Sequence, residues 1–224
     1  MKLHQFDEAP YNGHLILLIA LLGTAQMQLP ASENSAAEEA KGAARMFERD
    51  RVFGRYATNI YIASLTLTQG QVAHCMGVQQ DDILFSWLKD DVAELCPNCI
   101  LLVDHTISSI VLIIRGTFSA NDVITDVLCE EESFLDGFAH KGFLDGSNRV
   151  LDKCSTVLEN ALKDNPGYQL VVCGHSMGGS VAVLITLQLL NTNHHLVLPP
   201  GVSVRCVALA PVYKSEASFP PKIA

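Results

Sequence analysis

The residues best suited to chemistry lie at positions 174–178, where the pattern is G-x-S-x-G with Ser176 at its centre. An apolar strand-like run precedes this motif and an apolar helical run follows it, which is the context of a nucleophile elbow. Such a turn strains the serine backbone and brings neighbouring backbone segments close together, so positions 174 and 178 accommodate only small residues, here Gly174 and Gly178. We expect the Ser176 hydroxyl to be a nucleophile at a sheet edge. The backbone N–H of Met177, at the start of the helix, would then donate to an oxyanion.

His175 lies beside the serine and could be mistaken for its base. Adjacent residues diverge at such a turn, and the proton acceptor of an elbow serine normally comes from a distant loop. We therefore interpret His175 as a structural or supporting residue. A phosphate-binding glycine turn is the other interpretation of the motif, but neither GxxxxGK[ST] nor GxGxxG is present.

A second candidate for oxyanion binding is the turn Arg115-Gly116-Thr117, which follows a β-branched run. The loop that leaves such a strand lies at the carboxyl edge of a parallel sheet, where ligand sites gather. The backbone N–H of Thr117, and its hydroxyl, could bind the same oxyanion as Met177. The other interpretation is an ordinary tight turn in which Gly116 relieves the backbone.

The elements that position these residues follow from the apolar pattern. Continuous apolar runs predict buried strands over residues 110–115, 169–173 and 203–209. A helical period over residues 142–163, and an almost wholly apolar stretch over 180–190, predict the intervening helices. Alternating strands and helices predict an α/β fold with a mostly parallel sheet and flanking helices.

The N-terminal half is less regular. A helix is expected from about residue 35 to 67, broken or kinked near Gly54, and residues 83–88 form either a short strand or a helix. The apolar run over residues 15–22 is too short for a transmembrane helix. Acidic residues upstream of this run also argue against a signal peptide.

Composition excludes several classes of protein. The 15 basic against 24 acidic side chains give a formal charge of −9, so no nucleic-acid partner is expected. No metal or other cofactor is expected either, because Glu130–Glu132 is more typical of a solvated face than of a calcium site. The seven cysteines favour reduced thiols and an intracellular, cytoplasmic or membrane-peripheral location. The Cys96–Cys99 pair is interpreted as turn cysteines, with redox or zinc roles as alternatives.

Taken in order, these motifs are similar to the class 3 (fungal-type) lipase family, and most similar to its sn-1-specific diacylglycerol lipases. The resemblance covers roughly residues 45–212 and is carried by Arg115-Gly116-Thr117, Asp122, Thr125-Asp126, His140-Lys141-Gly142-Phe143 and the elbow. It implies an α/β-hydrolase fold, a Ser176 nucleophile and an oxyanion hole made by Thr117 and Met177. It also implies acylglycerol or other lipid-ester substrates, contact with a membrane surface, and a surface lid at about residues 119–139.

The domain division expected from this resemblance has three parts. Residues 1–34 are an apolar segment and linker, residues 35–212 an incomplete hydrolase-like domain, and residues 213–224 a tail unlike the family. A hydrolytic triad needs an acid and a histidine after the serine. The only acid after Ser176 is Glu216, and the only histidines there are His194 and His195, which precede it.

Three explanations of the missing triad partners stay open. The chain is a fragment or alternative product of a longer lipase, or it is a catalytically silent relative that binds lipid. In the third explanation, Glu216 and a histidine such as His140 or His105 replace the usual acid and histidine of the triad. The functional alternatives are therefore an acylglycerol hydrolase acting through an acyl-enzyme at Ser176, a non-catalytic lipid-binding protein, and an esterase for small soluble substrates.

Overall fold

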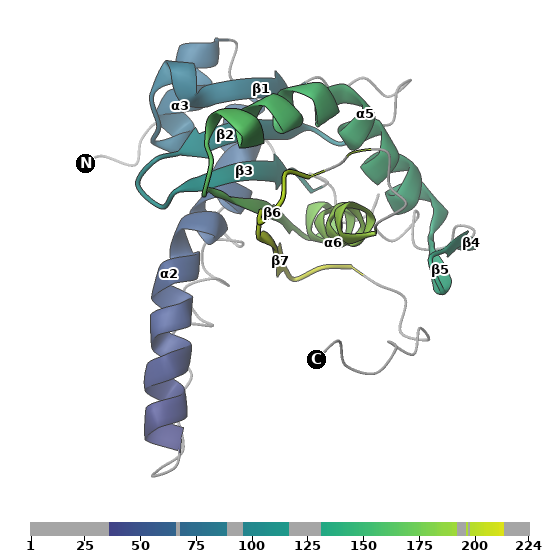
Figure 1. The fold of residues 1–224 in the computed structure, drawn as a ribbon, viewed down its shortest axis with the longest axis horizontal. Coiled ribbons are helices and arrows are strands. Elements are labelled where there is room, and N and C mark those ends of the chain that lie inside the picture. Colours follow the sequence, from purple (N-terminus) through teal and green to yellow (C-terminus); the bar gives the residue numbers. More distant parts are fainter. Residues whose placement is uncertain are drawn as a thin grey trace, which may run out of the picture.

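Figure 1 shows the fold of the chain in a computed structural model. The structure describes residues 36–65, 68–88, 96–116, 131–191, 196 and 198–212, and for 36–49 it describes the backbone alone. The expected N-terminal segment (1–34) and C-terminal tail (213–224) therefore lie outside the described residues. The same holds for residues 117–130, which include most of the expected lid.

A five-stranded sheet forms the centre of the molecule, with strand order β1-β2-β3-β6-β7. Strands β3, β6 and β7 are parallel, whereas β2 is antiparallel to both β1 and β3. The predicted mostly parallel sheet is confirmed. Of the two structures expected for residues 83–88, a strand or a helix, the strand is correct. The strands are β1 (Ile83–Trp87), β2 (Cys99–Asp104), β3 (Ser109–Ile114), β6 (Gln169–His175) and β7 (Val204–Leu209).

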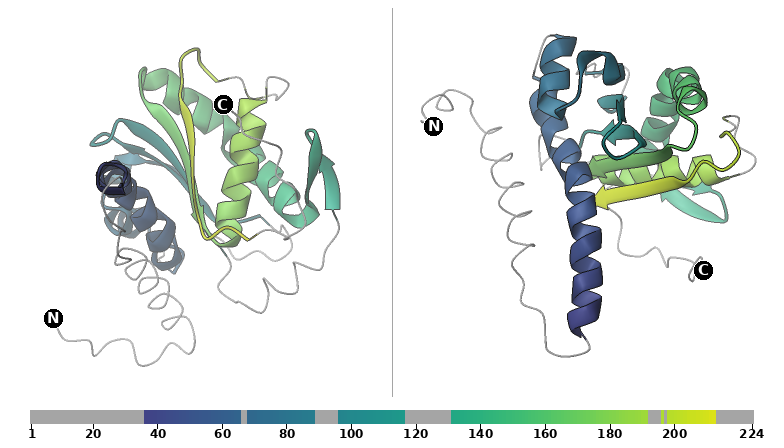
Figure 2. Two further views of the ribbon diagram at one scale, coloured as in Figure 1. Left: turned by 90° about the horizontal axis from the view of Figure 1, so that it is seen from below. Right: turned by 60° about the vertical axis from the view of Figure 1, so that its left-hand side comes forward.

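Helices cover both faces of this sheet, as Figure 2 shows. Helices α2 (Ala36–Ala63) and α3 (Gln69–Met76) pack on one face. Helices α5 (Lys141–Asp164) and α6 (Met177–Leu190) pack on the other. The helices predicted over residues 142–163 and 180–190 are thereby confirmed. A short 3₁₀ turn, Gln80–Asp82, leads into β1.

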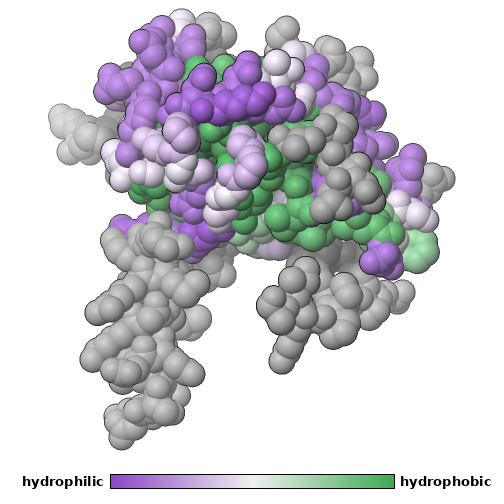
Figure 3. All heavy atoms as spheres, in the orientation of Figure 1, coloured by the Kyte–Doolittle hydropathy of each residue, from purple (hydrophilic) through white to green (hydrophobic). Residues whose placement is uncertain are grey.

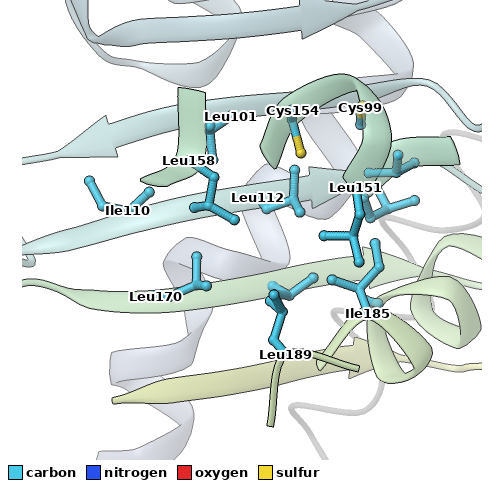
Figure 4. Packing of buried hydrophobic residues seen from close by; sticks show 14 of the residues in the cluster. Cys99, Leu101, Ile110, Leu112, Leu151, Cys154, Leu158, Leu170, Ile185 and Leu189 are labelled. Atoms are coloured by element: carbon cyan, nitrogen blue, oxygen red, sulfur yellow. The ribbon is translucent and has the colours of Figure 1, made fainter. Parts of the chain in front are cut away.

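Burial on both faces explains why the interiors of the central strands are apolar. All six residues of β2 and all six of β3 are buried. Successive side chains alternate, so Leu112 of β3 faces α5 and α6 whereas Ile113 faces α2 and α3. Figure 4 shows the α5/α6 side, where Leu112, Leu151 and Ile185 meet between strand and helices.

The expected interruption of the first helix at Gly54 is wrong, because α2 continues through this residue. A Cβ atom at Gly54 would meet only Leu209 Cδ1, at 3.8 Å. Glycine costs a helix about 1 kcal/mol. That cost is smaller than the gain from burying Phe53, Tyr56 and Ile60 of the same helix against the sheet.

An additional hairpin, β4 (Glu131–Phe134) with β5 (Gly137–His140), precedes α5. It is a separate two-stranded sheet, and it is the described part of the segment expected to be a lid. Within the described residues, no helix is both long enough and apolar enough to cross a membrane.

Candidate active site

Ser176 lies at the sharp turn between β6 and α6, at the carboxyl edge of the sheet. Its backbone has φ 56° and ψ −128°, a conformation that a non-glycine residue adopts only under constraint. The constraint is visible in its hydrogen bonds. The Ser176 N–H donates to the Leu209 carbonyl of β7 (2.9 Å), and the Ser176 carbonyl accepts from the Gly179 N–H (2.9 Å). The strand–turn–helix context predicted for the serine is therefore present.

The glycines of the motif are required by close backbone approach. A Cβ atom at Gly174 would lie 2.3 Å from the Gly178 carbonyl oxygen. One at Gly178 would lie 2.4 Å from the carbonyl oxygen of Ile114, at the end of β3. Both distances are far inside van der Waals contact, so the two glycines let β6, α6 and β3 converge at the serine.

The end of β3 passes directly beside Ser176. A Cβ atom at Gly116 would lie 3.4 Å from the Ser176 Cβ atom and 2.5 Å from the His175 carbonyl oxygen. Thr117, the predicted second oxyanion donor, is outside the described residues but is bonded to Gly116. Met177 is the first residue of α6, so its N–H belongs to the positive end of the helix dipole.

Tyr61 of α2 completes the support of this turn, and sequence reasoning did not identify it. Its side chain is 1% exposed, and its hydroxyl lies 3.2 Å from Nδ1 of His175. Burial raises the pKa of Tyr61 to about 12, while Arg115 and a backbone hydrogen bond of Gly116 oppose the rise. Burial also lowers the pKa of His175, which favours a neutral imidazole. No signal in the sequence links this helix residue to a motif more than a hundred positions away.

The two histidines considered above as replacement bases, His105 and His140, lie at different edges of the sheet. His105 is in the turn before β3, whereas Ser176 follows β6, which runs parallel to β3. Strands of this length separate the two edges by roughly 17 Å. His105 instead contacts the Tyr168 hydroxyl (2.9 Å) and Asp82 (3.4 Å). It therefore does not serve as the base for Ser176.

His140 lies at the end of β5, at the start of α5, on the same sheet edge as the elbow. Its Nδ1 accepts a hydrogen bond from the Phe143 N–H (3.3 Å), which caps the helix. The other residues considered for the triad, His194, His195 and Glu216, lie outside the described residues, as do Asp122 and Asp126.

Residues 111–219 match the family model described as "Lipase (class 3)". The chain is 33% identical over 154 residues to diacylglycerol lipase-beta of Mus musculus, a match that covers 65% of this chain. It is 36% identical over 92 residues to the secreted mono- and diacylglycerol lipase A of Penicillium cyclopium, covering 40% of this chain. These matches span only 22% and 30% of the two relatives.

Solved structures resemble the chain in fold. The non-glycosylated LIP2 lipase of Yarrowia lipolytica has a TM-score of 0.54 at 24% identity, covering 70% of this chain and 58% of that one. The triacylglyceride lipase of Rhizomucor miehei has a TM-score of 0.53 at 20% identity, covering 71% and 61%. The predicted α/β-hydrolase fold is confirmed by these neighbours and by the central sheet.

Proposed function

Because residues 111–219 belong to the class 3 lipase family, we propose that this protein hydrolyses acylglycerol esters, with Ser176 as the nucleophile. The observation that carries the proposal is the backbone of Ser176, held at φ 56° between a buried strand and an apolar helix. Strain of this kind persists where the surrounding structure imposes it, and it clusters at active sites. The relatives named as mono- and diacylglycerol lipases support acylglycerols as the substrate class.

The proposed reaction has two stages. The Ser176 hydroxyl oxygen attacks the ester carbonyl carbon and loses its proton to a base, while the carbonyl oxygen becomes an oxyanion. The N–H groups of Met177 and Thr117 stabilise this oxyanion. The intermediate expels the glycerol oxygen, which takes up a proton, and leaves an acyl-Ser176. Water then adds to this acyl group and releases the fatty acid, restoring the serine.

The electrostatic surroundings of Ser176 favour this chemistry. The positive end of the α6 dipole lies beside Ser176, so negative charge that forms at this position is stabilised. Partial burial lowers the pKa of His175 and so favours a neutral imidazole beside the serine, which leaves N–H groups to stabilise the oxyanion.

The alternative expected from the sequence is a non-catalytic lipid-binding role. After Ser176 the sequence contains no aspartate, and its only acid there is Glu216. A serine without an activating base keeps only the contributions of the oxyanion hole and substrate binding, roughly 10³–10⁴-fold over water.

The test is hydrolysis of a diacylglycerol by the full chain, with Ser176→Ala and Ser180→Ala as matched variants. Ser180 lies one turn further along α6 and donates its hydroxyl hydrogen bond to the Val212 carbonyl. We expect Ser176→Ala to abolish turnover and Ser180→Ala to retain it. Binding of a non-hydrolysable diacylglycerol analogue with no turnover by the unmodified chain would support the lipid-binding role instead.

A further inference from the structure

A tyrosine, a histidine and an aspartate lie together at the edge of the sheet opposite Ser176. The Tyr168 hydroxyl, just before β6, is 2.9 Å from Nδ1 of His105, in the turn between β2 and β3. The Oδ1 atom of Asp82, at the end of the 3₁₀ turn, lies 3.4 Å from Nε2 of the same ring. A hydroxyl within hydrogen-bond reach of a base that a third group orients is the arrangement of an activated nucleophile.

The Asp82 carboxylate favours the tautomer in which His105 acts as a base. Its Oδ2 atom accepts a hydrogen bond from the Gln79 N–H (3.1 Å), which leaves Oδ1 for the imidazole. A carboxylate at Nε2 favours the proton on this nitrogen, so Nδ1 is left to accept the hydrogen bond of the Tyr168 hydroxyl. This tautomer, inferred from the two partners, allows His105 to take up the proton of the phenol.

Hydrogen bonds on both sides of the tyrosine and the histidine fix their backbone. The N–H of Gln169, the residue after the tyrosine, donates to the Ser108 carbonyl in the turn between β2 and β3 (3.2 Å). At the start of this turn, the Thr106 N–H and hydroxyl both donate to Oδ1 of the buried Asp104 (2.9 and 2.6 Å). The backbone segments that carry the two side chains are therefore held next to each other by the fold.

The three side chains are accessible from solvent. The His105 side chain is 58% exposed and that of Asp82 is 19% exposed, while Tyr168 is half-buried. Figure 3 shows white and purple, hydrophilic atoms on the left of the molecule, where Figure 1 places the turn between β2 and β3. A small dissolved molecule can therefore reach the tyrosine hydroxyl.

The place of Tyr168 in the fold limits the reaction that it can carry out. This residue precedes a strand, whereas Ser176 stands at the N-terminus of a helix, so an oxyanion formed at the phenol gains nothing from the α6 dipole. Its acyl donors must therefore carry a leaving group that departs as a stable anion. The aryloxide of an aryl ester meets this condition, whereas the alkoxide of an acylglycerol does not.

We propose that Tyr168 is acylated by small aryl esters, with His105 as the general base and Asp82 as the residue that orients it. The Tyr168 oxygen attacks the ester carbonyl carbon while Nδ1 of His105 takes the phenol proton. The bond between the carbonyl carbon and the aryloxide then breaks, the aryloxide leaves, and the imidazolium passes its proton to solvent. The products are an acyl ester on Tyr168 and a free aryloxide, and one acyl group is transferred per chain.

The experiment treats the full chain carrying Ser176→Ala with p-nitrophenyl acetate, so that the elbow serine does not contribute. Acetylation of the peptide that contains Tyr168 is followed by mass spectrometry between pH 7 and pH 9. On this background the test variants are His105→Ala and Asp82→Asn. His74→Ala is the matched control, because His74 is an exposed histidine on α3.

We expect Tyr168 to be acetylated faster than any other tyrosine, and His105→Ala to slow this step about a hundredfold. Asp82→Asn should slow it roughly tenfold, and His74→Ala should leave it unchanged. The pH dependence separates a base from a purely structural partner. A phenol without a base reacts as its phenolate, the fraction of which rises about tenfold per pH unit below about pH 10. His105→Ala should show this steep rise, and the parent chain should show a much flatter profile.

Equal rates in the parent and in His105→Ala, with the same pH dependence, would overturn the proposal, since His105 would then only fasten the turn. Acetylation spread evenly over the tyrosines would overturn it as well. Urea denaturation establishes that each variant is folded. If His105→Ala does not fold, Asp82→Asn decides: a slower rate supports the orienting role, and the rate of the parent contradicts it. A failure of Ser176 to hydrolyse acylglycerols would change none of these outcomes.

Discussion

The hydroxyl of Tyr61 lies 3.2 Å from Nδ1 of His175, and a Cβ atom at Gly116 would lie only 2.4 Å from the same hydroxyl. One side chain of α2 thus contacts the ends of both β3 and β6. Because His175 precedes Ser176, and Gly116 passes beside it, Tyr61 holds the two backbone segments that form the candidate site.

Replacing Tyr61 by phenylalanine should therefore slow turnover without weakening substrate binding. The ring keeps its packing, but the hydroxyl contacts that align the elbow are lost. We expect kcat to fall about five- to tenfold, with KM unchanged, which is the effect of losing one net hydrogen bond from the aligned state. Steady-state kinetics on a soluble ester measure the two constants.

Tyr56→Phe is the matched control for this change. Tyr56 lies on the same helix, and its hydroxyl donates to the buried Asp104 carboxylate (2.6 Å), at the far edge of the sheet. Its loss should lower the free energy of unfolding by about 1–3 kcal/mol and leave kcat unchanged. Equal effects of the two variants on kcat would contradict a positioning role for Tyr61.

Two glycines on helices should respond to alanine in opposite directions. Gly178→Ala places a Cβ atom 2.4 Å from the Ile114 carbonyl oxygen, and should destabilise the fold by about 3 kcal/mol. Gly54→Ala meets only a side-chain methyl group at 3.8 Å, and should stabilise α2 by about 0.5–1 kcal/mol. Urea denaturation at one pH gives both values, and a stable Gly178→Ala protein would show that the elbow is less tightly packed than the structure indicates.

His175 should make the protein less stable in acid. Burial lowers its pKa in the folded chain, whereas the unfolded chain keeps the ordinary value near 6.5. Below about pH 6.5 the unfolded state therefore binds the proton first, and stability falls as the pH falls through this window. His175→Gln should remove this part of the pH dependence. Denaturation of both proteins between neutral pH and pH 5 measures it, and identical slopes would show that His175 titrates normally in the fold.

The apolar pattern was sufficient to predict the parallel core, because residues 110–114 of β3 and 170–173 of β6 are apolar and buried on both faces. It was insufficient where tertiary contacts decide. Residues 83–88 form a strand because they pair with β2, and α2 runs through Gly54 because its neighbours pack on the sheet. The serine and its glycines could be predicted because the elbow constrains residues that are adjacent in sequence. Tyr61 could not, because its contact with His175 depends on how α2 crosses the sheet.

Labelling by a fluorophosphonate probe tests the central claim most directly, because the probe reacts covalently with activated serines. The folded chain is compared with Ser176→Ala and with Ser180→Ala, and the labelled peptide is identified by mass spectrometry. We predict labelling on Ser176 that disappears in Ser176→Ala and persists in Ser180→Ala. A folded chain that takes up no label would contradict the account, since Ser176 would then hold the elbow geometry without being an activated nucleophile.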